Sequence, residues 1–134
     1  MSTAIAVLVG VLAWAFAAAF AAGGGAVLAL GSHDARLDPS LRALGERRER
    51  AHRALAFARI LAHLAAGCAI ALALRFSSRS LLVSLAIAIP VALAAVLLSE
   101  SIARSVGDAF GVRAAERLSP LIRLVERGLA PVVM

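Results

Sequence analysis

The sequence predicts an all-α integral membrane protein, with three transmembrane helices followed by an amphipathic juxtamembrane helix. Of its 134 residues, 62% are hydrophobic and only 16% are charged, far from the usage of soluble domains. Three apolar runs approach or exceed the length that a helix needs to cross a hydrocarbon core about 30 Å thick. Nearly all the arginines lie between or after these runs, where they would stay out of lipid.

The first span is expected at about residues 3–30, a stretch without a charged side chain. A cleaved signal peptide is the alternative because residues 17–22 include small residues, but this run has no basic start and is too long. Gly23, Gly24 and Gly25 interrupt the run. Glycines in a membrane helix permit close helix contact or line a cavity, so we expect these three to face protein.

The loop at 31–53 is polar and should lie outside the lipid. Asp38 followed by Pro39 is typical of a helix start, with the carboxylate accepting from first-turn amides and proline at the first helical position. We therefore expect a short interfacial helix that runs into the second span, at about residues 54–74. His33 and His52 lie in the polar loop and are expected to be solvated.

The second span contains Arg59 and His63, which are costly in lipid. Arg59, His63 and Gly67 repeat every four residues and so share one helix face, which should point into the protein. We expect His63 to face a vestibule or to hydrogen-bond a neighbouring helix. Cys68 follows His63 by five residues and lies on a different face, which argues against a soft-metal site formed by the pair.

The third span is expected at 81–98, about 27 Å long at 1.5 Å per residue, with Pro90 near its middle favouring a kink. It ends at Ser99 and Glu100. A carboxylate there must be paired, protonated, hydrated or bound to a cation. Glu100 is thus the first candidate cation ligand, with the Ser99 hydroxyl as a second oxygen. The alternative is that Glu100 reaches the headgroups or pairs with Arg104 one turn later.

After the third span, apolar and charged residues alternate with a helical period over about 108–131. The apolar stripe is one-sided, as in a helix that lies in the membrane interface. Pro120 and Pro131 are expected to break or kink this helix.

The distribution of arginine predicts the orientation. Six arginines lie in the first loop, two in the connector at 75–80 and five from Arg104 onward. The positive-inside rule then places the loop and the tail in the cytoplasm and the N-terminus outside, as in a multi-pass protein of the cell (inner) membrane. Orientation also accounts for the net charge of +6, so we expect a bilayer rather than a nucleic acid as partner.

Nucleophile elbows, phosphate loops, paired catalytic carboxylates and zinc-hydrolase motifs are all missing from the sequence. The protein is therefore not expected to be an enzyme. Alanine is frequent in all three spans, which favours close helix packing. Because three helices alone bury few of these faces, we expect a homodimer.

Over nearly its whole length the chain resembles the transmembrane domain of the cyclin M and CorC (CNNM/CorC) family of magnesium transporters, and four segments carry the resemblance. Residues 20–30 stand in place of the family's small-residue and acidic motif, and Gly67-Cys68 in place of its Gly-Asn step. Residues 99–104 align with its Gly-Glu-x-x-Pro-Lys motif, and residues 118–131 are similar to its juxtamembrane helix.

The resemblance implies a dimeric domain that transports Mg²⁺, with the ion near a cytoplasmic vestibule. Glu100 corresponds to the family's glutamate, while Cys68 replaces its asparagine and Arg104 its lysine. Expected metal ligands are Glu100, Ser99 and backbone carbonyls near Gly67, and His63, Cys68 and Arg104 are expected to face the vestibule. One alternative is a non-transporting membrane scaffold or partner subunit of the same fold. Another is a small tethering protein whose basic tail holds anionic lipid.

Overall fold

The computed structural model describes residues 2–30, 38–76 and 80–133. In chain order these residues form α1 (Thr3–Leu28), α2 (Pro39–Glu46), α3 (Arg48–Phe76) and α4 (Leu81–Val133). The described part of the chain is therefore all-helical, as predicted. Three stretches are long and apolar enough to cross a membrane: Thr3–Leu28, Arg48–Arg75 and Leu81–Gly107.

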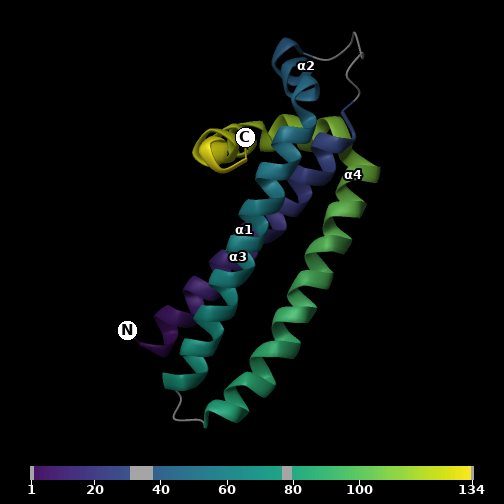
Figure 1. Cartoon of the computed structure of the whole chain (residues 1–134). Helices are drawn as coiled ribbons and strands as arrows, with labels where there is room; N and C mark the ends of the chain where they lie inside the picture. Colours follow the sequence, from purple (N-terminus) through teal and green to yellow (C-terminus); the bar gives the residue numbers. More distant parts are fainter. Residues whose placement is uncertain (1, 31–37, 77–79, 134) are drawn as a thin grey trace.

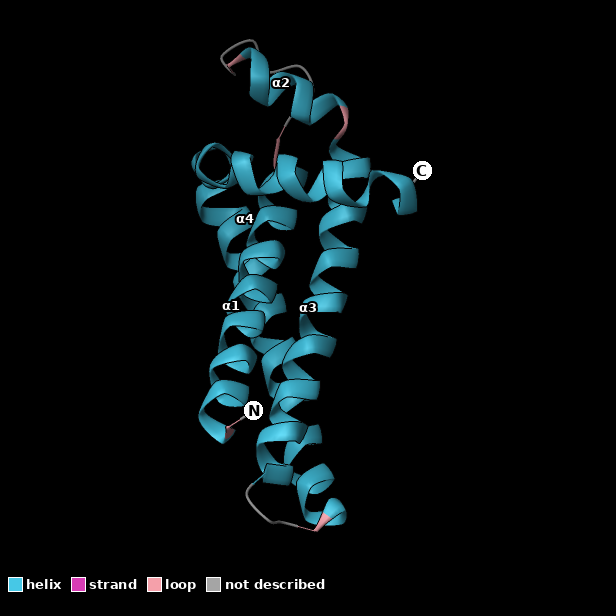
Figure 2. Cartoon of the chain, turned by 90° about the vertical axis from the view of Figure 1, so that its left-hand side faces the viewer, coloured by secondary structure: helices cyan, strands magenta, loops and turns pink. Residues whose placement is uncertain are grey.

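The three long helices form an elongated bundle in which α1 packs against both α3 and α4 (Figure 1). Helix α2 and the part of α4 after Gly107, which we call the tail, lie together at one end of this bundle (Figures 1 and 2). The N-terminus lies toward the other end (Figure 1). We call the first end the arginine-rich end, because α2, the start of α3 and the tail hold most of the arginines.

The predicted interfacial helix is present but does not run into the second span. Helix α2 ends at Glu46, and the backbone leaves the helical region at Arg47, with φ −105° and ψ 17°. The next helix then begins at Arg48, six residues before the predicted start at 54. Pro39 takes the first helical position as expected, but the Asp38 carboxylate accepts from the Ser40 hydroxyl at 2.8 Å instead of capping first-turn amides. The Asp38 backbone carbonyl accepts from those amides in its place.

The third long helix is much longer than the 81–98 predicted. Ser99 and Glu100 do not end it, because both polar side chains find partners on α3. The amphipathic segment predicted at 108–131 is continuous with this helix, and Pro90, Pro120 and Pro131 all lie inside α4. Figure 1 shows that the tail nevertheless turns away from the long axis and crosses the end of the bundle.

The hydrophobic core lies at the arginine-rich end. It joins residues from all four helices, with Leu30, Leu55 and Ile122 fully buried. The tail contributes Ile122 and Ala115 to this cluster, and α2 contributes Leu41 and Leu44. Burial of these side chains therefore holds α2 and the tail against the ends of α1 and α3.

The glycine triplet of α1 faces the neighbouring helices. Side chains of Leu55 and Ile122 lie nearest to Gly23, and the ring of His52 lies nearest to Gly24. At Gly25 the backbone of α1 meets the backbone carbonyl of Ala103 in α4, with no room for a methyl group. At this triplet α1 therefore contacts α3 and also meets the backbone of α4.

Candidate functional site

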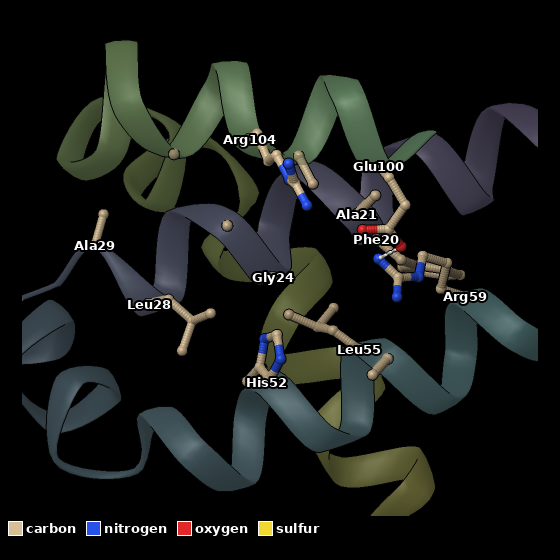
Figure 3. Close-up of a pocket in the computed structure, with 14 residues that line it drawn as sticks. Phe20, Ala21, Gly24, Leu28, Ala29, His52, Leu55, Arg59, Glu100 and Arg104 are labelled. Atoms are coloured by element: carbon tan, nitrogen blue, oxygen red, sulfur yellow. Dashed lines mark ion pairs between the residues drawn. The ribbon is translucent and has the colours of Figure 1, made fainter. Parts of the chain in front are cut away.

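A polar cavity of about 490 Å³ lies between α1, α3 and α4, near the arginine-rich end. Its charged or titratable lining residues are His52, Arg59, Glu100 and Arg104, and the α1 glycines Gly24 and Gly25 form part of its wall. Figure 3 shows Glu100 and Arg104 projecting from α4 while His52 and Arg59 project from α3. Two arginines face one carboxylate here, so the lining carries a net positive charge even with His52 neutral.

An ion pair spans this cavity from one helix to the other. The Arg59 guanidinium lies 2.7 Å from the Glu100 carboxylate, with about a quarter of the Arg59 side chain and less than half of the Glu100 side chain exposed (Figure 3). The expected alternative, a pair between Glu100 and Arg104 on the same helix, does not form. A charge-assisted bond to a guanidinium on the facing helix both neutralises the carboxylate and ties α3 to α4.

Ser99 lies next to Glu100 in sequence but points elsewhere. It is fully buried, and its hydroxyl lies 3.0 Å from His63 Nε2. The same hydroxyl lies within 3.0 Å of the Ala95 and Val96 carbonyls of its own helix. The Ser99 hydroxyl and His63 Nε2 therefore form a hydrogen bond between α4 and α3, and the histidine tautomer determines which of the two donates. The prediction that His63 hydrogen-bonds a neighbouring helix is therefore confirmed.

Gly67 lines a different cavity. This apolar cavity, of about 500 Å³, is walled mostly by aliphatic residues of the three long helices, together with Trp14 and His63. A Cβ added at Gly67 would meet nothing within 4 Å. Cys68 is exposed and lines neither cavity.

The predicted ligands Glu100, Ser99 and Gly67 are thus not gathered around one point. Within residues 2–30, 38–76 and 80–133, no three His, Cys, Asp or Glu side chains cluster as a metal site would require. The oxygen that Glu100 offers is already bonded to a cationic side chain. Magnesium binding at these residues stays a prediction.

The structure does bring Arg59 and His63 to the face of α3 that meets α4, as their spacing predicts. It adds His52, which was expected to be solvated. His52 is only partly exposed, and its Nδ1 atom is buried without a hydrogen-bond partner in the described part of the chain. The signal was in the sequence, since His52, Ala56, Arg59 and His63 follow one another at spacings of four, three and four on a single face.

The bond between Ser99 and His63 predicts a measurable contribution to stability. Ser99→Ala removes a buried link between α3 and α4, and we expect it to lower the free energy of unfolding by about 0.5–1.5 kcal/mol. Ser101→Ala is the matched control, because the exposed Ser101 hydroxyl bonds only the Leu97 carbonyl of its own helix. Denaturant unfolding in detergent should separate the two variants, and equal losses would contradict an inter-helix role for Ser99.

Comparison of the chain with protein-family models, with curated proteins and with solved structures found no match.

Proposed function

We propose that the protein is an integral membrane protein with Thr3–Leu28, Arg48–Arg75 and Leu81–Gly107 as its three spans. Many large apolar side chains along these stretches are exposed, including Leu8, Leu64 and Leu97, which lipid would cover. The arginine-rich end would then lie on the cytoplasmic side, and the N-terminus outside. The gathering of α2 and the tail at one end of the bundle supports this orientation, because a single side of the membrane then receives most of the positive charge (Figure 1).

Within that membrane we propose that the protein is a divalent cation transport domain similar to those of the CNNM/CorC family. The observation that carries this proposal is the Glu100 carboxylate, which lines a cavity between three apolar helices. A carboxylate is rarely kept in such a place without a cation or a basic partner. Here Arg59 acts as an internal cation, which a transported ion has to displace before the Glu100 oxygens can bind it.

That same contact favours a second function. If Arg59 holds Glu100 permanently, the carboxylate is already neutralised by the protein itself and the chain is a membrane scaffold or partner subunit without transport. The excess of arginine over carboxylate in the polar cavity favours this alternative, since it repels a divalent cation.

We also propose a homodimer. Few residues of the Leu81–Gly107 stretch are buried within the chain, and an outward face of this helix is left to lipid or to a second copy. Small side chains such as Ala86 and Ala94 on this helix permit close approach of a second helix.

The two functions differ in what Arg59→Gln does to magnesium binding. If the cavity receives a cation, removing the competing guanidinium frees Glu100, and Mg²⁺ should stabilise the Arg59→Gln variant more than the wild type. An ion present at ten times its Kd adds about 1.4 kcal/mol to the free energy of unfolding. The measurement is the thermal stability of purified protein in detergent across a magnesium titration.

The double variant Arg59→Gln/Glu100→Gln is the control, because it keeps the neutral glutamine at 59 and removes only the carboxylate. A magnesium response in Arg59→Gln that disappears in the double variant supports cation binding at Glu100. Transport through this cavity is rejected, and the scaffold retained, when neither the wild type nor Arg59→Gln responds.

A further inference from the structure

A second charged cavity lies at the arginine-rich end, apart from the one that contains Glu100. It has a volume of about 330 Å³ and lies between α2, the start of α3 and the last part of the tail. We call it the arginine cavity, because four of its lining residues are arginines. Its polar lining residues are Ser40, Arg47, Arg50, Arg123, Glu126 and Arg127.

Two of these residues form its framework. Glu126 is more than nine-tenths buried, and its carboxylate lies 3.3 Å from the Arg47 guanidinium. Arg47 Nε also donates to the Ala43 carbonyl at 3.2 Å, which fixes the plane of the guanidinium. This pair links the turn between α2 and α3 to a buried carboxylate of the tail, and so holds these two walls of the cavity together.

The other three arginines have no such partner. Arg50, Arg123 and Arg127 are exposed, and no hydrogen bond or ion pair joins them to any residue in the described ranges. With one carboxylate against four guanidinium groups, the lining carries a net charge of +3. Asp38 accepts from Ser40 at the edge of the cavity, and counting it still leaves an excess of positive charge. The cavity therefore has an excess of positive charge and three arginines that could bind an anion.

The opposite face of the same tail segment is apolar. Val125, Gly128 and Leu129 line a groove of about 520 Å³ whose other walls are apolar residues of α1 and α3, such as Phe16 and Leu61. Arg123 and Arg127 are one turn apart on the basic face, while Val125 and Leu129 are one turn apart on the apolar face. A helix of this kind lies along a membrane surface with its apolar face in the acyl region. The arginine cavity then lies at the depth of the phosphate groups.

We propose that the arginine cavity binds the phosphate-bearing headgroup of an anionic phospholipid. Guanidinium groups bind phosphate oxygens in a planar geometry with two hydrogen bonds. Several guanidinium groups around one cavity favour a headgroup with a net negative charge over a headgroup with no net charge. The position at the membrane surface favours a lipid over a soluble phosphate. This inference rests on the proposed membrane insertion but not on cation transport.

The test compares two variants that lose the same charge from the same end of the molecule. Arg123→Gln/Arg127→Gln removes two cavity arginines, whereas Arg48→Gln/Arg53→Gln removes two that do not line the cavity. Purified full-length protein in a neutral detergent is titrated with phosphatidylglycerol, phosphatidylcholine or inorganic phosphate, and bound lipid is counted by native mass spectrometry. We expect phosphatidylglycerol binding to weaken about 30-fold in the first variant, a factor of about five per arginine. The second variant should bind nearly as the wild type does.

Equal losses in the two variants would mean that diffuse charge attracts the lipid, and would overturn the proposal. Binding of phosphatidylcholine as strong as that of phosphatidylglycerol would overturn it as well, because the site would then not distinguish headgroups by their net charge. A response to inorganic phosphate that phosphatidylglycerol does not exceed would assign the cavity to a soluble anion instead. None of these outcomes depends on Glu100, and a protein that stays in solution without detergent would reveal a failure of membrane insertion separately.

Discussion

Gly25→Ala is expected to destabilise the protein by about 1–3 kcal/mol, the range for adding atoms to a packed interior. The added methyl group would overlap the Ala103 carbonyl, and a backbone atom cannot move aside as a flexible side chain does. The contact continues along both helices, since a Cβ at Gly107 would lie 3.2 Å from the Gly25 oxygen, and one at Gly111 would lie 2.8 Å from Ala29 Cβ. Relief requires α1 and α4 to separate along this whole contact. Denaturant unfolding in detergent measures the loss.

Gly67→Ala and Gly128→Ala are the controls for this prediction. Both glycines lie in helices, and an added Cβ would meet nothing within 4 Å at either position. Alanine is the better helix former by about 0.5–1 kcal/mol, so these variants should be neutral or more stable than the wild type. If all three substitutions changed the free energy of unfolding by the same amount, helix propensity and not the close contact of α1 with α4 would determine the effect.

These glycines illustrate what the sequence predicts well. An uninterrupted apolar run permits few structures, so the three long helices follow from composition and length. The glycine triplet could be assigned to a protein-facing position because small residues in such helices allow close packing. The four-residue spacing of Arg59 and His63 likewise indicated one shared face. Each of these predictions needs only one helix and its period.

The partners of those side chains were harder to predict. The local neighbour of Glu100 is Arg104, and only the packing of α3 on α4 shows that Arg59 reaches the carboxylate instead. His52 looked like a loop residue because charged residues surround it in sequence, yet α3 begins before it and carries it to the cavity wall. The predicted end of the third span was wrong for a related reason. Ser99 and Glu100 resemble the end of a membrane helix until their partners on α3 are known. Contacts between helices are not encoded in the period of either helix.

The ion pair between Arg59 and Glu100 gives the second large expected effect. Arg59→Gln and Glu100→Gln each leave one charge beside an apolar bundle without its partner, and we expect each to cost about 1–3 kcal/mol of unfolding free energy. The double variant should cost less than the sum, because it removes both charges together. The difference is the interaction energy of the pair, expected at about 0.5–3 kcal/mol. Detergent-solubilised protein unfolded with denaturant supplies all four values of the cycle.

Arg104 provides the matched test of whether this coupling is specific. It lines the same cavity and lies one turn from Glu100, but it forms no ion pair with any residue in the described part of the chain. Arg104→Gln combined with Glu100→Gln should therefore be additive within about 0.3–0.5 kcal/mol. Coupling of Glu100 to Arg104 as strong as that to Arg59 would mean that the carboxylate is shared between the two arginines. Arg59 would then no longer be the single group that a cation has to displace, and the magnesium response of Arg59→Gln would have to be sought in Arg59→Gln/Arg104→Gln.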